Sequence, residues 1–139
     1  NLPHPTGHFD TILFFNILEH LRARPRVLTQ VRRVLKSGGS LVGIVPFLVA
    51  VHGDPHDYVR PTREEIKALF LEAGFSDIHI RPVGRGPLLA SYYQSEFLWP
   101  RVLKLVVLPA VLGLDAIILK LRPHWREKFP LSYAFSARG

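Results

Sequence analysis

The pattern of residues 9–46 constrains the fold more than any other feature of the sequence. Residues 9–15 (FDTILFF) are apolar and rich in β-branched and aromatic side chains, which is typical of a strand buried on both faces. Residues 25–36 repeat apolar side chains at helical spacing, and residues 41–45 (LVGIV) form a second apolar run. A strand, a helix and a strand in this order indicate a right-handed crossover between two parallel strands. The sequence therefore predicts an α/β fold in which residues 9–15 form a central strand.

The ends of the first helix are also marked in the sequence. Pro25 suits its first turn, and Lys36 is expected in its last turn. Gly38 and Gly39 follow, and glycine readily adopts the positive φ that ends a helix. Pro46 is expected to end the second strand.

A further helix and two further strands are predicted. Thr62 and Glu65 have the spacing of a capping box, and Gly74 follows the last apolar position of the helix that they start. Residues 75–80 alternate apolar and polar side chains, which indicates a strand near an edge of the sheet. Residues 131–138 alternate in the same way and suggest a final strand.

Residues 84–130 are dense in apolar side chains and interrupted by prolines, so two or three short helices are expected there. Residues 102–121 approach the length of about 20 apolar residues that a membrane span needs. Their charged residues, with Pro109 and Gly113, favour a buried or interface-lying helix pair instead. We interpret the chain as one domain in which residues 84–130 are a helical insertion that binds an acceptor or faces a membrane.

Composition narrows the class of protein. The chain has 139 residues, 18 Lys and Arg against 11 Asp and Glu, and no Cys, which excludes disulfides, thiolate zinc sites and a cysteine nucleophile. The net charge of +7 attracts phosphates, anionic lipid or nucleic acid. With no secretory signal at its start, the chain is expected in the cytoplasm, with peripheral membrane contact as an option. Because it has no Met, we expect it to be cut from a longer protein.

The basic side chains are concentrated in one stretch. Between Glu19 and Asp54 there are six Lys and Arg and no acidic residue. A solvated helix face is one explanation, and binding of anionic lipid or nucleic acid is the other. No aromatic side chains are interleaved with these cations to stack on bases, so nucleic acid is not an expected partner.

The order of motifs resembles the C-terminal half of a class I S-adenosylmethionine-dependent methyltransferase of type 11. The matching pieces are Phe9-Asp10 and its strand, residues 16–21 (NILEHL), residues 33–39 (RVLKSGG), the strand ending in Pro46, and residues 73–75 (AGF). The resemblance implies a partial Rossmann-like fold with strands four to seven of a seven-stranded sheet, the last antiparallel between the fifth and sixth. The family's glycine-rich loop and the acidic end of its second strand have no counterpart in this sequence.

The resemblance also implies a cofactor and its contacts. S-adenosylmethionine would lie with its methionine part beside Asn16 and Ile17, and with its adenine under the loop that carries Leu2 and Pro3. Packing of Leu2 and Pro3 on the core is the alternative.

Methyl transfer is an in-line displacement that mainly requires alignment of acceptor and methyl group. If the acceptor is a hydroxyl, a nearby base can take its proton, and His20, His56 and Asp57 are the candidates, with His20 first. The alternative is that Glu19 and His20 only cap or anchor the following helix.

A metal site is the sharper hypothesis for the same residues. Some relatives, among ubiquinone-pathway and small-RNA O-methyltransferases, bind a divalent ion through a Glu-x-x-Glu-His arrangement. Here Asn16 replaces the first carboxylate, and an amide is a weaker ligand for a hard cation. His52 and His56 are further donors, but Pro55 argues against a helical turn that would align them. The sequence therefore predicts no metal.

The acceptor is expected to be a small molecule, a glycan or a lipid-linked compound. Tyr58 and Arg60, in a loop expected to cover the site, are candidates for substrate binding. Tyr92 and Tyr93 are further candidates, with core packing or a membrane interface as alternatives. The alternative function is a non-catalytic module that docks on a membrane or an acidic partner.

Overall fold

The computed structural model describes residues 1–53 and 56–139, which form two compact units. The first unit comprises residues 1–46, 51–81 and 133–139, and the second comprises residues 47–50 and 82–132. The second unit therefore contains all of residues 84–130, which the sequence analysis interprets as a helical insertion. Asp54 and Pro55, the latter used above to argue against aligned histidines, lie outside the described residues.

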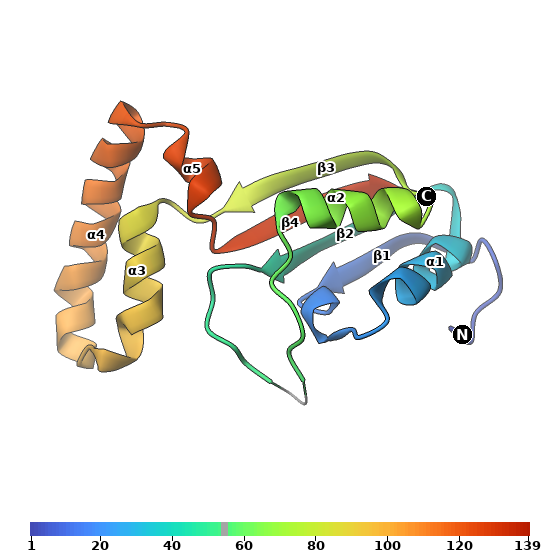
Figure 1. Cartoon of the computed structure of the whole chain (residues 1–139), viewed down its shortest axis with the longest axis horizontal. Coiled ribbons are helices and arrows are strands. Elements are labelled where there is room, and N and C mark those ends of the chain that lie inside the picture. Colours follow the sequence, from blue (N-terminus) through green and yellow to red (C-terminus); the bar gives the residue numbers. More distant parts are fainter. Residues whose placement is uncertain (54–55) are drawn as a thin grey trace. The chain divides into compact units, whose positions relative to one another are not determined.

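A four-stranded sheet is the centre of the fold (Figure 1). Its strands are β1 (Phe9–Phe15), β2 (Leu35–Pro46), β3 (Ser76–Val83) and β4 (Ser132–Arg138), in the order β1-β2-β4-β3. β1 and β2 are parallel, with Phe15 opposite Ile44. β4 runs opposite to its neighbours (Figure 1). The predicted α/β fold and the predicted place of the last strand are confirmed.

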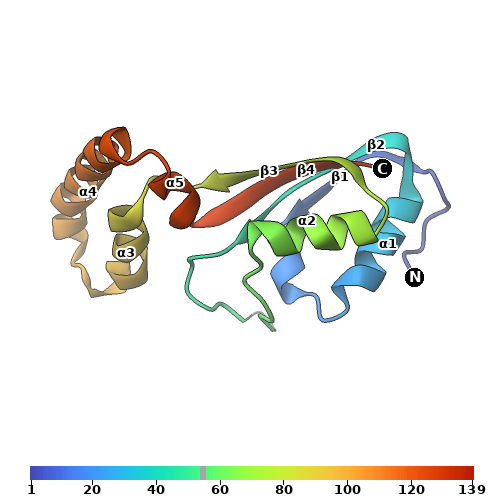
Figure 2. The same cartoon turned by 45° about the horizontal axis from the view of Figure 1, so that its top comes forward.

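Helices α1 (Arg24–Val34) and α2 (Arg63–Glu72) cover the same face of the sheet (Figure 2). The apolar side chains expected to face inward do so, and Leu28, Ile66 and Phe70 are fully buried. The ring of Phe70 meets that of Phe135 on β4 edge to face, with centroids 5.0 Å apart. Each such side chain stabilises the fold by about 1.5–3 kcal/mol through removal from water.

The helix ends predicted from the sequence are confirmed for α2, but the predicted end of α1 is wrong. The hydroxyl of Thr62 accepts a hydrogen bond from the backbone N–H of Glu65 at 3.2 Å, and Gly74 has φ 85°, both as expected. By contrast, α1 ends at Val34, and Lys36 lies in β2 rather than in the last helical turn. The reason is strand pairing, because Leu35 is already paired with Phe9 of β1. The side chain of Lys36 also bonds both oxygens of Asp10 on β1, at 2.9 Å.

β1 is the edge strand of the sheet in the described part of the chain. Phe14 is buried, but Leu13 is 61% exposed and Phe15 is 51% exposed. The expectation of a central strand buried on both faces is therefore not met by these residues. No described strand pairs with the outer side of β1, and this leaves one row of apolar side chains in contact with solvent.

The second unit is helical. It contains α3 (Pro87–Ser95), the short η2 (Glu96–Leu98), α4 (Arg101–Leu121) and α5 (Trp125–Lys128). The carboxylate of Asp115 on α4 is completely buried and accepts hydrogen bonds from the backbone N–H groups of Leu88 and Leu89, at 3.1 and 2.8 Å. These are first-turn donors of α3 that have no partner within their own helix. Asp115 thus joins the two helices.

α4 differs from the expected helix pair, because it is one helix that continues through Pro109 and Gly113. An internal proline frees the carbonyl four residues earlier, which here belongs to Leu105. Leu105 is 76% exposed, so water can satisfy that carbonyl. Among the described residues, α4 is the one helix long and apolar enough to cross a membrane, with a mean hydropathy of 2.4 and 11% of its central window buried.

Candidate functional site

The two parallel strands end at the same edge of the sheet, which is where open α/β sheets bind ligands. β1 ends at Phe15 and β2 at Pro46. Asn16 follows β1 with φ 50°, a conformation that asparagine tolerates better than most residues, and its N–H donates to the carbonyl of Ile44 at 2.9 Å. This turn starts the short helix η1 (Leu18–His20) beside the strand ends.

Glu19 is the buried centre of this region. Its exposed fraction is 0%, and its backbone carbonyl accepts a hydrogen bond from the N–H of Tyr58 at 2.8 Å. Among the described residues, neither of its carboxylate oxygens has a hydrogen-bond partner. A buried polar group without partners is costly, because it has lost water and gained nothing in return. Such a group in a native fold calls for a ligand or another functional explanation.

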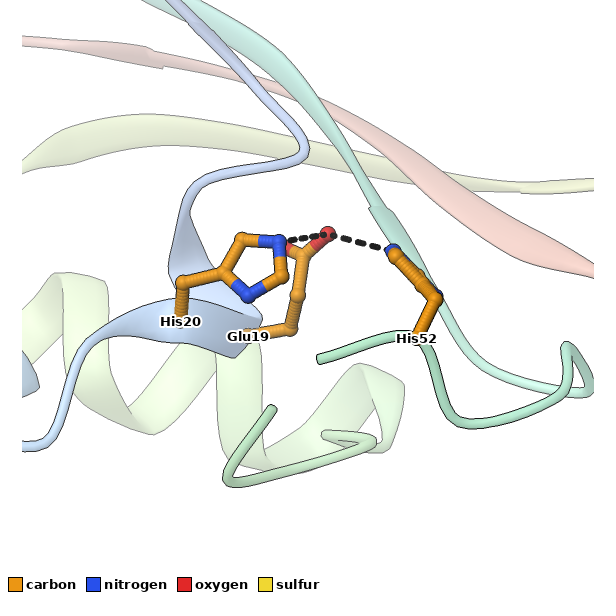
Figure 3. Close-up of side chains that lie close together, drawn as sticks. All are labelled: Glu19, His20 and His52. Carbon is orange, nitrogen blue, oxygen red and sulfur yellow. Dashed lines mark ion pairs between the residues drawn. The ribbon is translucent and has the colours of Figure 1, made fainter. Parts of the chain in front are cut away.

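Two histidines face this carboxylate (Figure 3). Nε2 of His20 lies 3.7 Å from Oε1 of Glu19, and Nε2 of His52 lies 3.9 Å from the same oxygen. The two imidazole rings are nearly perpendicular, with centroids 5.5 Å apart. One ligand atom from each of the three residues lies within 4.8 Å of the other two. We refer to Glu19, His20 and His52 as the Glu19 cluster.

The other ring nitrogen of His20 is fixed by the backbone. Nδ1 of His20 lies 2.5 Å from the carbonyl oxygen of His56. A carbonyl can only accept, so Nδ1 carries the proton and a neutral ring keeps its lone pair on Nε2. His56, a predicted base, thus contributes its carbonyl to the cluster, while its own side chain is exposed.

Asp57 and Arg60 support His52 from the other side. The side chain of Asp57 is 2% exposed, and Arg60 donates to both of its oxygens through Nη1 and Nη2. Oδ2 of Asp57 also accepts the backbone N–H of His52 at 3.0 Å and lies 3.7 Å from Nδ1 of that ring. The hydrogen bonds from Arg60 lower the pKa of Asp57 to about 2, against the opposing effect of burial. The carboxyl group of Asp57 is therefore ionised at neutral pH.

The remaining predicted residues are distributed more widely. Asn16 and Ile17 lie at the tip of β1, exposed and next to the cluster in sequence. Leu2 and Pro3 are exposed; the carbonyl of Leu2 accepts from Nη2 of Arg33 at 3.1 Å, and Leu2 lines a small hollow beside α1. Their cofactor contacts remain a prediction.

The predicted substrate-binding residues fall in both units. Tyr58 is 47% exposed beside the cluster, and Arg60 is held by Asp57. Tyr92 and Tyr93 belong to the second unit, where Tyr92 is buried against its own helices and Tyr93 is 46% exposed. None of these observations tests substrate binding.

Glu19 and His52 are not among the catalytic, cofactor-binding or substrate-binding residues predicted from the sequence. The capping alternative for Glu19 and His20 is not observed, because α1 starts at an N-cap, Ala23, that has no side-chain hydrogen bond. The signal available was a carboxylate beside a histidine directly after an apolar strand. From the sequence, His52 is considered only as a further donor for a metal site, together with His56, and the structure brings His52 rather than His56 to Glu19.

Comparisons with known proteins agree with this architecture. A family model described as a methyltransferase domain matches residues 1–43. A probable S-adenosylmethionine-dependent methyltransferase of Mycobacterium tuberculosis (strain H37Rv) is 30% identical over 94 residues, which cover 63% of this chain and 34% of the relative. The chain thus resembles S-adenosylmethionine-dependent methyltransferases over part of its sequence. It spans about a third of the length of that relative.

Solved structures extend the likeness in fold to nearly all residues of this chain. A SAM-dependent methyltransferase from Archaeoglobus fulgidus superposes with a TM-score of 0.60 at 16% identity, over 98% of this chain and 62% of that one. The [4+2]-cyclase SpnF superposes with a TM-score of 0.59 at 20% identity, over 99% of this chain and 52% of that one. At these identities the likeness concerns the fold alone, and the fold does not by itself fix the reaction.

Proposed function

We propose that this chain is the C-terminal part of a methyltransferase domain that transfers a methyl group from S-adenosylmethionine to an oxygen of a small molecule, glycan or lipid-linked acceptor. The observation that carries the proposal is the Glu19 cluster at the carboxyl ends of two parallel strands. The relative of this chain in M. tuberculosis is named as a probable S-adenosylmethionine-dependent methyltransferase. The glycine-rich loop that the resemblance implies has no counterpart in residues 1–139, so in this proposal these residues supply only part of the cofactor site.

In this proposal the sulfonium of the cofactor supplies the reactivity, and the protein aligns the acceptor. The acceptor oxygen attacks the methyl carbon, the bond from carbon to sulfur breaks, and the sulfur keeps its electron pair. The hydroxyl proton must leave as the new bond forms. A base within hydrogen-bond reach accelerates this step by about 10²–10⁴-fold.

His20 is best suited to take that proton. Its Nδ1 is fixed on the carbonyl of His56, which leaves Nε2 as the basic nitrogen. The buried carboxylate of Glu19 at 3.7 Å favours the imidazolium that forms. Asp57 is a positioning residue instead, because both of its oxygens are bonded to Arg60.

Calorimetry with S-adenosylmethionine tests the proposal. The full-length protein that contains this chain should bind the cofactor with one-to-one stoichiometry, and residues 1–139 alone should release little or no heat. Absence of binding to the full-length protein at millimolar cofactor would end the catalytic interpretation. Asn16→Ala should weaken binding, whereas Glu64→Ala, a change of an exposed polar residue on α2, should not.

A second function is favoured by α4. Val102, Leu105 and Val106 are 78%, 76% and 67% exposed and follow helical spacing, as do Ile117 and Leu121 near the other end. Basic residues flank this apolar surface on both sides: Arg101, Lys104, Lys120, Arg122, Arg126 and Lys128. Apolar side chains with cations at their ends suit the surface of an anionic bilayer. We therefore propose that α4 docks the protein on such a membrane, where a lipid-linked acceptor would be found.

The basic residues of α1 contribute less to docking than their number suggests. Arg33 donates to the carbonyls of His4 and Leu2, at 2.9 and 3.1 Å, and Arg32 donates to the carbonyl of Gly74 at 3.2 Å. Lys36 is paired with Asp10. These cations hold segments of the first unit together, so the docking surface is assigned to α4.

Flotation with vesicles tests whether α4 is the docking surface. The chain should float with vesicles that contain phosphatidylglycerol and less with phosphatidylcholine alone. The double variant Leu105→Ser/Val106→Ser should lower the partition coefficient by about tenfold or more, since each buried apolar side chain contributes about 1.5–3 kcal/mol. Leu71→Ser on α2, 56% exposed in the wild type, is the matched control and should not change it. Equal partitioning of all three proteins would exclude α4 as the docking surface.

A further inference from the structure

We propose that Glu19, His20 and His52 bind a divalent transition-metal ion through Oε1 of Glu19 and the Nε2 atoms of both histidines. The inference departs from the sequence-based expectation of no metal. It is independent of methyl transfer, because binding of the ion is measured without cofactor or acceptor.

The first argument is the geometry of the three ligand atoms. Oε1 of Glu19 is 3.7 Å from Nε2 of His20 and 3.9 Å from Nε2 of His52. Tetrahedral zinc with ligands at about 2.0–2.1 Å holds them about 3.4 Å apart. The cluster therefore needs to contract by only a few tenths of an ångström at these two contacts.

The second argument is the state of Glu19. It is completely buried, and its carboxylate oxygens have no hydrogen-bond partner in the described chain. Distances of 3.7 and 3.9 Å to the two rings are too long for hydrogen bonds. A cation between the three side chains would neutralise the carboxylate and coordinate the oxygen that faces it, which removes the cost of burying it.

The third argument is the set of groups behind the ligands. Histidines that bind metals donate their other ring N–H to a carbonyl or a carboxylate. Nδ1 of His20 faces the carbonyl of His56 at 2.5 Å, and Nδ1 of His52 faces Oδ2 of Asp57 at 3.7 Å. Arg60 fixes Asp57 in place. Nδ1 of His20 thus has an acceptor on the side opposite Glu19, whereas Nδ1 of His52 lies 3.4 Å from the donor Nη2 of Arg60 and 3.7 Å from Oδ2 of Asp57. Metal binding through Nε2 of His52 would place the proton of that ring on Nδ1, where Asp57 is the nearby acceptor.

The donor set selects the class of ion. Two imidazoles and one carboxylate suit zinc, iron, cobalt or manganese, whereas magnesium and calcium prefer oxygen ligands. Three protein ligands leave at least one coordination position for water or another oxygen ligand. The two rings are 24% and 48% exposed, so an ion can enter from solvent.

Metal binding and proton transfer compete for the same nitrogen. An ion on Nε2 of His20 prevents that atom from accepting a proton, so the proposed base acts only in the metal-free protein. A chelator therefore separates the two roles. If Nε2 of His20 is the base, removal of the ion should raise the rate of methyl transfer; if the rate does not change, His20 is not the base, and metal binding still stands on the titration alone.

The experiment is a titration of the untagged chain, stripped with EDTA, with ZnCl₂ in a calorimeter and with CoCl₂ in a spectrophotometer. We expect one ion per chain and visible d–d absorption bands from cobalt in a site of low symmetry. Glu19→Gln and His52→Ala should each weaken binding by at least 100-fold, and Asp57→Asn by about 10–100-fold through loss of the negative charge behind His52. Circular dichroism checks that each variant is folded.

Two further variants guard against adventitious binding by surface histidines. His4 and His8 stack with centroids 5.7 Å apart near the start of the chain, and His79 pairs with Asp77 at 2.9 Å. His4→Ala/His8→Ala and His79→Ala should keep the full affinity. The inference is overturned if the wild type takes up neither ion in the micromolar range, or if the loss of affinity follows these surface histidines instead of the cluster.

Discussion

Nε2 of His20 lies 3.7 Å from Oε1 of Glu19, although neighbouring side chains in a regular helix point in different directions. The short helix η1 and the positive φ of Asn16 bring the two side chains together at the strand tips. Glu19 is inside the protein, while His20 is 24% exposed. The pair therefore connects the core to the edge of the sheet where ligands bind.

The buried carboxylate of Glu19 should destabilise the metal-free protein. Glu19→Met should leave the free energy of unfolding unchanged or raise it by about 1–3 kcal/mol, because an unpartnered buried polar group is removed. Urea unfolding in the presence of EDTA measures this. A loss of more than 1 kcal/mol would mean that the carboxylate has a stabilising partner. His79→Ala, an exposed change, is the reference for the effect of an ordinary surface substitution.

Addition of zinc should reverse the effect of Glu19→Met on stability. With zinc at 100 times its dissociation constant, the wild type should gain about 2.7 kcal/mol of stability and Glu19→Met should gain almost none. Thermal melts with and without ZnCl₂ measure the two gains. Equal gains for both proteins would locate the ion elsewhere.

The ion pair between Lys36 and Asp10 should be visible in a titration. The hydrogen bond and charge of Lys36 lower the pKa of Asp10 below its ordinary value of 3.8. This pair therefore stabilises the fold above that value, and its contribution is lost as the pH falls through the lower, folded-state pKa. Carboxyl NMR should show the pKa of Asp10 rising in Lys36→Gln and in high salt, since both groups are exposed. An unchanged value in Lys36→Gln would rule out the pair in solution.

Two glycines should respond oppositely to the same substitution. A Cβ on Gly43 would lie 2.2 Å from the backbone oxygen of Phe14 and 2.6 Å from the ring of Phe135, and the backbone cannot move without loss of the β1–β2 pairing. Gly43→Ala should therefore cost about 3 kcal/mol or more. A Cβ on Gly113 in α4 meets no atom within 4 Å, so Gly113→Ala should stabilise its helix by up to about 1 kcal/mol. Chemical denaturation of the two variants compares them, and similar effects would contradict the packing described for β2.

Asp115 should hold α3 and α4 together. Asp115→Ala leaves the N–H groups of Leu88 and Leu89 without their acceptor and should cost about 1–3 kcal/mol. Hydrogen exchange at those two amides should speed up more than at the amides of α2. Unchanged protection at Leu88 and Leu89 would show that another group accepts these bonds.

Much of the fold could be predicted because its signals are local. The run 9–15, the capping pair Thr62 and Glu65, and Gly74 each determine their own element, and the parallel pairing follows from the helix between two apolar strands. Lys36 was placed wrongly because its pairing with Asp10 is a contact between segments 26 positions apart. The continuity of α4 through Pro109 was missed because it depends on an exposed carbonyl.

The site was harder to predict than the fold. His20 stands out beside an apolar strand, but His52 reaches Glu19 only through the course of the chain after β2. The buried state of Glu19 is a property of packing and leaves no mark in the sequence. The sequence names Glu19, His20 and His52 among possible metal donors, but their proximity depends on the packing of the chain (Figure 3).

The most direct measurement of the central claim is transfer of a tritium-labelled methyl group from S-adenosylmethionine by the full-length protein into an extract containing glycans and lipid-linked compounds. The wild type and His79→Ala should transfer label at the same rate. His20→Ala should be slower by about 10²-fold or more, in keeping with loss of a general base. Absence of transfer by the wild type, or equal rates for wild type and His20→Ala, would contradict a methyltransferase that acts through the Glu19 cluster.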